Sequence, residues 1–556
     1  MIKDVQDLSI PATIQDVIMA RVDSLPESAK EVLQSGSVIE REFSFELIKQ
    51  VIDVSQEELL SRLSLLKDTE LLYERGVYPQ SNYIFKHALT REVVYDSLLT
   101  KRKKELHEKT GLAIEELYKD NIDEHYEVLA GHFIYAENYE KGAEYSRLSG
   151  RRAEKTGLLN DASVYGEKGV ACLERLPRTE EVEKKLIHAR TVLGLYSQQL
   201  SHFVKSKKDI EPIIDLASKS GYQRRISQIY TILGTYDLCI EENFPSAFKQ
   251  LEKASKISEG IKDFATLVNI YYWLGCAHMW SCEFEEASHY WGKALDMSLA
   301  GNSPWAISTV RSSNWVYQYQ GRIDLGLSMH ETLQIAEKSG DIYSKAMAYN
   351  NFGVSCFYKG FFKELEGYLS KAIDLCERIS LWMPNVYGLT YLGEFYFEIG
   401  EYQKSIDNYS KAILILEHTK MMPSWMNLSK LGVLKAKIML NHRDIEIESL
   451  YGYDAGNKIK IYESQTRNFI AAILMNIDVL RIDEAESWIK KAIEAAKKNG
   501  MMWDLGRDYA LYAELFKRKG DKPKAKENLN KAIEILKECG ADGWVEKYEK
   551  ELTALA

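Results

Sequence analysis

A repeat mark, usually a small residue after an apolar one, recurs along this chain in steps of 39 to 41 residues. The nine marks are Gly194, Gly234, Gly275, Asn314, Gly353, Gly393, Gly432, Ile473 and Ala513. A second small residue comes about twelve positions after many of them, and a position that is often Ala lies seven further on. A fixed period of this length is the signature of a repeat array, so a single compact domain is not expected for 556 residues.

Each repeat is expected to be a helical hairpin. The small mark allows the second helix to cross the first closely, and alanines at helical spacing serve the same purpose on the second helix. Turn signals such as Gly360, Gly400 and Gly520 fall between the two helices. Only ten prolines occur in the whole chain, which favours an essentially all-α protein without flexible joints.

The segments Tyr391–Ile413 and Tyr512–Ile533 resemble the tetratricopeptide repeat, with a period near 40 in place of 34. That resemblance implies an all-α, right-handed superhelical solenoid of about ten hairpins over residues 176–556. Each repeat is then expected to contact mainly its neighbours. The stretch Leu431–Asp454 lacks the alanines of the second helix and predicts a distorted hairpin.

The first hundred residues do not follow this period. Start and stop signals predict helices at 13–25, 28–39, 44–52 and 55–67, then two short strands at 71–73 and 83–85. The last three of these helices, followed by the β-hairpin, match the winged-helix arrangement. We therefore expect a small winged-helix domain at 1–105, a linker helix and entry repeats at 106–175, and the solenoid after them.

Four N-terminal segments are similar in sequence to one family: Ile10–Pro26, Ser35–Ile48, Leu65–Glu74 and Phe85–Leu99. It is the bacterial signal-transduction ATPases with numerous domains (STAND), especially those fused to class III adenylate or guanylate cyclases. The resemblance implies that this chain is the sensor or partner-docking part of such a system, either a piece of a longer polypeptide or a stand-alone descendant of one. An ATPase or cyclase module is then an expected partner.

A phosphate-binding loop Gly-x4-Gly-Lys-Ser/Thr is absent, since the only Gly-Lys pair, Gly292-Lys293, is followed by Ala294. No cofactor is therefore expected. The sequence also lacks Gly-x-Ser-x-Gly, and His107 and His330 each begin a motif without the second histidine of a zinc protease. We predict that the chain is not an enzyme.

Other residues with possible chemistry have plain structural interpretations. Cys276, His278, Cys282 and His289 suit zinc by type, but Cys276 and His278 point about 160° apart on one helix, so no metal site is expected. His87 could contact a nucleotide-binding module, although a packed or capping histidine is favoured. The run Lys101–Lys104 could touch phosphates or acidic lipid, but glutamates follow at once and favour a solvated helix face.

Charge argues against nucleic acid as a partner. The chain has 72 basic and 82 acidic side chains, a net of −10, and residues 1–105 hold 14 Lys/Arg and 18 Asp/Glu, a net of −4. A winged-helix, DNA-binding transcriptional regulator with a repeat sensor is nevertheless the alternative function. Seven scattered cysteines and an N-terminus without an apolar run favour the cytoplasm. The uncharged stretch Phe264–Cys282 contains Asn269 and His278 and is expected to be a buried helix, so no membrane partner is expected.

The tetratricopeptide resemblance places a partner-binding groove on the inner wall formed by the first helices of the hairpins. Offsets from three marks give twelve positions for this inner wall: Tyr272, Cys276, Met279, Trp280, Met347, Asn350, Val354, Phe357, Tyr358, Tyr387, Glu394 and Phe397. Tyr, Trp and Met are enriched in binding hot spots. We expect an exposed wall between residues 264 and 400 that docks a peptide or helix of another protein.

Overall fold

A computed structural model describes residues 12–313, 315–327 and 330–555. The chain forms two compact units, Met1–Glu154 with Asp161–Ala189, and Lys155–Asn160 with Arg190–Ala556. The boundaries expected at 105 and 175 both lie inside the first unit. The repeat mark Asn314 and the N-terminal ten residues lie outside the described residues.

The N-terminal part of the first unit has the helices and hairpin that the sequence predicts, each within two residues of the expected bounds. Its elements are α1 (Ala12–Asp23), α2 (Glu27–Ile39), β1 (Glu42–Ser44), α3 (Phe45–Val51), α4 (Gln56–Asp68), β2 (Leu72–Arg75) and β3 (Asn82–Phe85). The strands form an antiparallel sheet in the order β1-β3-β2. Strand β1 was not predicted, because three residues are too few to show an alternating pattern.

Six helices complete the first unit. They are α5 (Ala88–Ser97), α6 (Thr100–Leu117), α7 (Tyr126–Tyr135), α8 (Tyr139–Lys155), α9 (Leu159–Arg175) and the start of α10 (Glu180–Gln199). Leu129, Ala130 and Phe133 of α7 belong to the same apolar core as the sheet. Gly111 allows α6 to approach this core, since a Cβ there would lie 2.8 Å from the Phe133 ring.

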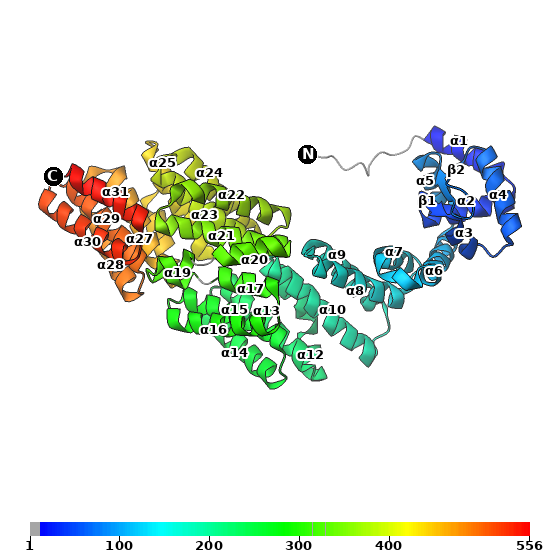
Figure 1. Ribbon diagram of the computed structural model, residues 1–556, viewed down its shortest axis with the longest axis horizontal. Coiled ribbons are helices and arrows are strands. Elements are labelled where there is room, and N and C mark those ends of the chain that lie inside the picture. Colours follow the sequence, from blue (N-terminus) through cyan, green and yellow to red (C-terminus); the bar gives the residue numbers. More distant parts are fainter. Residues whose placement is uncertain (1–11, 314, 328–329, 556) are drawn as a thin grey trace. The chain divides into compact units, whose positions relative to one another are not determined.

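The second unit, which we call the repeat unit, is a succession of helical hairpins (Figure 1). Its regular pairs are α13 (Gln223–Cys239) with α14 (Phe244–Gly260), α15 (Phe264–Trp280) with α16 (Phe284–Ala300), α21 (Ile342–Lys359) with α22 (Phe362–Arg378), α23 (Trp382–Glu398) with α24 (Tyr402–Thr419), α27 (Glu463–Ile477) with α28 (Ile482–Lys498), and α29 (Met502–Arg518) with α30 (Lys522–Glu538).

The less regular elements of the repeat unit are α11 (Phe203–Ile210), α12 (Ile214–Ser220), α17 (Pro304–Ser312), α18 (Val316–Tyr319), α19 (Ile323–Leu327), α20 (His330–Ser339), α25 (Pro423–Met439), α26 (Ile447–Ala455) and α31 (Asp542–Ala554). The distorted hairpin expected at Leu431–Asp454 is confirmed, because α26 has only 9 residues while its partner α25 has 17.

Close helix crossings explain the 40-residue period. A Cβ added at Gly275 would lie 2.3 Å from Trp291 Nε1, and one at Gly353 would lie 2.6 Å from a Leu369 methyl carbon. At Gly432 the nearest atom would be Tyr409 Cζ, at 2.4 Å. Real Cβ atoms do not approach so closely, so a residue without a side chain is required at these three marks.

The repeats contact mainly their neighbours, but they also contact repeats that are distant in the sequence. Residues far apart in the sequence are joined by hydrogen bonds: Ser201 to Met383, Glu242 to Ser424, and Phe357 to Trp544, separated by 182, 182 and 187 residues. With a period of about 40 residues, these separations correspond to roughly four and a half repeats. The repeat unit therefore winds into turns that touch each other, and its core is continuous from Phe203 to Tyr548.

The uncharged stretch that begins at Phe264 forms α15, whose inner residues are buried in this core. Among the described residues, no helix combines the length and apolarity needed to cross a bilayer.

Candidate functional site

The expected inner wall is covered by the protein itself. Ten of its twelve residues are buried, and the other two, Tyr272 and Phe397, are half-buried. Phe357 and Tyr358 pack against Trp503, with ring centroids 5.7 and 4.6 Å away, and Trp544 packs against Phe357. The expected exposure is therefore wrong, because these aromatic rings are buried between adjacent turns. Their expected role in partner binding stays a prediction, which would require the turns to separate.

The indole nitrogens of the covering tryptophans fix this arrangement. Trp503 Nε1 donates to the carbonyl oxygen of Tyr358 at 3.0 Å, and Trp544 Nε1 donates to that of Phe357 at 2.8 Å. Both carbonyls belong to the last turn of α21, where helix ends leave carbonyl groups without an intrahelical partner. The Phe357 oxygen also accepts from the Gly360 amide at 3.0 Å. Phe357 and Tyr358 of the inner wall thus lie in the contact between the end of α21 and the later helices α29 and α31.

Glu394 of the inner wall takes part in a buried charge network. Its carboxylate accepts from Lys435 Nζ at 2.8 Å and from the Tyr409 hydroxyl at 2.6 Å. Desolvation lowers the pKa of Lys435, and the nearby Glu394 and Glu398 partly offset this effect. Glu394, which the sequence predicts to contact another protein, therefore forms its hydrogen bonds within the chain.

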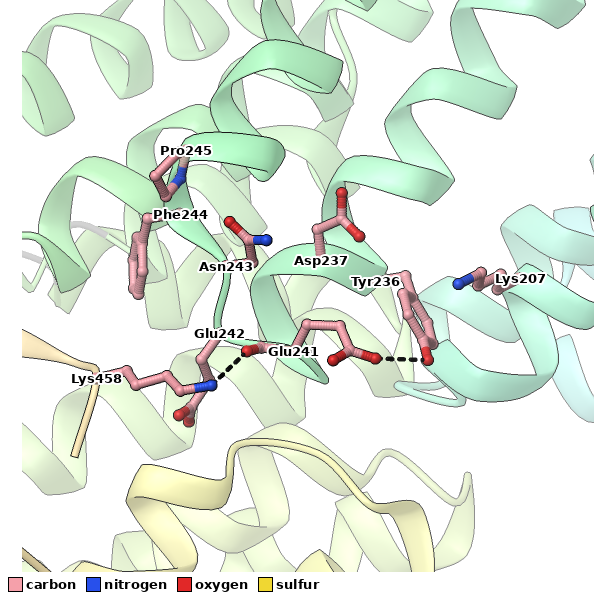
Figure 2. A pocket seen from close by; sticks show the side chains of 9 residues that line it. All are labelled: Lys207, Tyr236, Asp237, Glu241, Glu242, Asn243, Phe244, Pro245 and Lys458. Atoms are coloured by element: carbon pink, nitrogen blue, oxygen red, sulfur yellow. Dashed lines mark hydrogen bonds between the residues drawn. The ribbon is translucent and has the colours of Figure 1, made fainter. Parts of the chain in front are cut away.

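An open pocket of about 630 Å³ lies where two turns meet, and we call it the seam pocket (Figure 2). It is lined by Lys207, Tyr236, Asp237, Glu241, Glu242, Asn243, Phe244, Pro245 and Lys458. Most of these residues surround the turn between α13 and α14, and Lys458 reaches in from the segment after α26. The pocket therefore combines side chains from two turns of the superhelix.

Hydrogen bonds tie the two sides of the seam pocket together. Lys458 Nζ donates to the backbone oxygen of Glu241 at 3.1 Å, and the Tyr236 hydroxyl donates to the Glu241 carboxylate at 3.0 Å (Figure 2). Behind them, Glu242 accepts from the Ser424 amide at 2.8 Å and from its hydroxyl at 2.6 Å. Burial raises the pKa of Glu242, and the hydrogen bonds from Ser424 oppose that rise.

The open side of the seam pocket offers both apolar and charged surface. The Tyr236 ring lies 3.8 Å below Lys207 Nζ, and Phe244 and Pro245 begin the next helix. Asp237 and Glu241 supply carboxylates beside these rings. Such a surface can take an aromatic or aliphatic anchor together with a basic side chain of a partner segment.

Sequence reasoning could not find this pocket. Tyr236 and Lys458 are 222 positions apart, and no local pattern shows that the superhelix brings together residues more than five repeats apart. The only local signal is the turn Glu242-Asn243, where Glu242 has a φ of 50° and Asn243 caps α14 through Ser246.

The other residues with possible chemistry lie apart from this pocket. His278 pairs with Glu283 at 2.7 Å and stacks on Tyr290, while Cys276 is buried. No group of three His, Cys, Asp or Glu side chains suited to a metal occurs in the described part of the chain. His87 precedes α5 with an exposed side chain that makes no cap hydrogen bond, so the packed or capping role favoured for it is not seen.

No protein-family model and no curated protein matches this sequence. Solved structures of low identity are similar to it. A Rap protein in complex with competence and sporulation factor shares 16% identity over 70% of this chain and 99% of its own, with a TM-score of 0.44. The Cut9–Hcn1 hetero-tetramer of the APC/C shares 13% over 83% and 95%, also with a TM-score of 0.44.

A third solved structure is a STAND protein with a tetratricopeptide-repeat sensor from Pyrococcus horikoshii. It shares 14% identity over 98% of this chain and 68% of its own, with a TM-score of 0.34. These likenesses concern the helical-repeat fold, and no residue of this chain takes a role from them.

Proposed function

We propose that this chain is a protein–protein interaction scaffold without an enzymatic activity of its own, and that it serves as the sensor or partner-docking part of a STAND-type ATPase system. The seam pocket carries the proposal. A partner segment that binds there contacts two turns of the superhelix at once, so binding is coupled to how the turns pack. The STAND context is supported by the sequence similarity of the N-terminal segments to that family. It is also supported by the order of elements from α2 to β3, which we interpret as a winged helix.

Glu241→Lys tests the docking role, because it reverses a charge at the exposed rim of the seam pocket without entering the core. We expect this variant to capture about tenfold less, or even smaller amounts, of the proteins that the wild-type chain captures, because a like charge then faces the basic residue of the partner. Quantitative mass spectrometry of captured proteins gives the measurement. A P-loop ATPase is expected among them, or in the same polypeptide.

Glu401→Lys is the matched control, because it makes the same charge change at an exposed helix start in a different hairpin. Equal capture by both variants would show that the seam pocket is not the docking site. If the wild-type chain enriches no protein beyond a heat-denatured bait, the scaffold proposal fails altogether.

The alternative, duplex DNA binding through the N-terminal helices, is disfavoured by the surroundings of α4. Arg62 pairs with Glu58 at 2.6 Å and with Glu31 at 3.1 Å, and Lys67 pairs with Glu74. The cations that would contact phosphates are thus neutralised within the chain. We predict no duplex binding in fluorescence anisotropy at about 150 mM salt, where even basic proteins bind non-specifically at only about 10⁻⁴–10⁻⁶ M. A sequence-specific complex that is abolished by Arg62→Ala and Lys67→Ala would favour the regulator instead.

A further inference from the structure

A second open pocket, of about 560 Å³, lies in the first unit and has a markedly basic lining. We call it the basic pocket. Lys103 and Lys104 of α6 line one side, and Lys168 and Arg175 of α9 line another. Glu137 is the only carboxylate among its lining residues. Four cations and one anion give the pocket a net charge of +3.

The internal contacts leave most of this charge uncompensated. Lys104 pairs with Glu137 at 2.6 Å, and Lys103 lies 3.8 Å from Asp96, at the outer limit of an ion pair. Across the described residues, neither Lys168 nor Arg175 forms an ion pair with a carboxylate, and Lys168 instead lies 5.0 Å from the Tyr165 ring centre. The run Lys101–Lys104 is therefore more than a solvated face, because two of its members line a concave surface.

The start of α6 adds to the positive potential. Thr100, the first residue of α6, lines the pocket, and the preceding Leu99 gives the helix no side-chain cap. The first turn of α6 contains no acidic residue, although acidic side chains are the ones that stabilise a helix start. The start of α6 and the lysines thus line the same pocket, and Glu137 is the single lining carboxylate that opposes them.

The remaining wall is aromatic and rigid. Tyr95 and His107 are joined by a hydrogen bond of 3.0 Å, His107 Nδ1 lies 2.9 Å from His132 Nδ1, and Tyr135 stacks on His107 at 4.9 Å. Burial lowers the pKa of His107 to about 4, so its imidazole is neutral near pH 7 and adds no charge. This wall offers flat rings to the uncharged part of a ligand.

We propose that the basic pocket binds a small soluble phosphate ester. Its phosphate would lie among Lys103, Lys168, Arg175 and the start of α6, and its organic part would lie against Tyr95 and Tyr135. Arg and Lys donors with free helix N–H groups are the combination that proteins use for phosphate. The volume of about 560 Å³ is within the usual range for a site of a small molecule.

Calorimetric titration of the full chain with phenyl phosphate, inorganic phosphate and phenol tests this site. We expect phenyl phosphate to bind, inorganic phosphate to bind about tenfold more weakly, and phenol not to bind, because the ligand needs both the anion and the ring. The double variant Lys168→Glu with Arg175→Glu should weaken phenyl phosphate binding about tenfold or more.

Lys101→Glu with Arg178→Glu is the matched control, since it makes the same charge change at exposed residues of the same region outside the pocket lining. This control should change the affinity for phenyl phosphate less than about twofold at a salt concentration that screens the general effect of the altered net charge. Circular dichroism confirms that both variants are folded. Equal weakening by the two double variants, or no binding to the wild-type chain at millimolar phenyl phosphate, overturns the proposal. Binding only to anionic lipid vesicles would likewise contradict a soluble ligand.

Discussion

Replacing Lys435 by Met is expected to lower the free energy of unfolding of the repeat unit by about 3–5 kcal/mol. The side chains of Lys435 and Glu394 are only 4% and 3% exposed, and they form an ion pair of 2.8 Å. Without the ammonium group, the Glu394 carboxylate keeps a single hydrogen bond, from Tyr409. A buried charge that has lost its partner is costly, whereas the lost apolar contacts are largely replaced by the Met side chain.

Tryptophan fluorescence during urea unfolding measures this effect in the repeat unit alone, because all ten tryptophans lie between Trp273 and Trp544. Lys437→Met is the control, since Lys437 is an exposed residue of the same helix, and its change should stay within about 0.5 kcal/mol. Combining Lys435→Met with Glu394→Gln should recover most of the loss, because no unpaired charge then remains. An unaltered midpoint for Lys435→Met would show that the pair contributes nothing.

Local features of the fold could be predicted from the sequence, and long-range ones could not. The period of Gly234, Gly275 and Gly353 reports a contact within one hairpin, so it gave the hairpins correctly. The burial of Phe357 depends on Trp544, 187 residues later. No residue near Phe357 signals how tightly the superhelix winds, because that pitch is the sum of small rotations over several repeats.

The same reasoning explains the sites. The family pattern that predicts Glu394 and Tyr358 on the inner wall assumes that this wall is open, and aromatic residues suit a binding interface and a core alike. The lysines at 103 and 104 were visible as a charged run, but their companions Lys168 and Arg175 lie on α9 and are isolated in the sequence. A pocket whose cations come from two helices about 65 residues apart has no sequence pattern of its own.

The second large effect is expected from Arg507→Ala, which breaks the ionic contact between turns. Glu398 of α23 accepts from Arg507 of α29 and from Lys547 of α31, each at 2.6 Å. The Arg507 guanidinium also lies 4.3 Å from the Trp544 ring centre. Glu398 is only 9% exposed and keeps Lys547 as a partner, so losing the hydrogen bond from Arg507 should cost about 1.5–3 kcal/mol, again measured by tryptophan fluorescence in urea.

The pH dependence of the wild-type chain gives an independent check on this contact. Burial alone would raise the pKa of Glu398, but attraction by Arg507 and Lys547 outweighs it and brings the pKa to about 2. A carboxyl whose pKa is lower in the folded state stabilises the fold above its unfolded pKa of 4.5, and this contribution is lost as the pH falls from 4.5 toward 2. The corresponding free energy is about 3 kcal/mol.

Glu398→Gln should therefore remove that part of the acid dependence, so that stability falls less steeply between pH 4.5 and 2 than in the wild type. The remaining slope comes from other carboxyls such as Glu337 and Glu486, whose pKa values are also lowered to about 2. If the variant loses stability between pH 4.5 and 2 as steeply as the wild type, Glu398 is not the group that titrates.

Hydrogen exchange distinguishes a local from a global effect of Arg507→Ala. Faster exchange confined to α21, α29 and α31 would mean that the turns separate while the hairpins persist, which is the state in which Phe357 and Tyr358 become accessible to a partner.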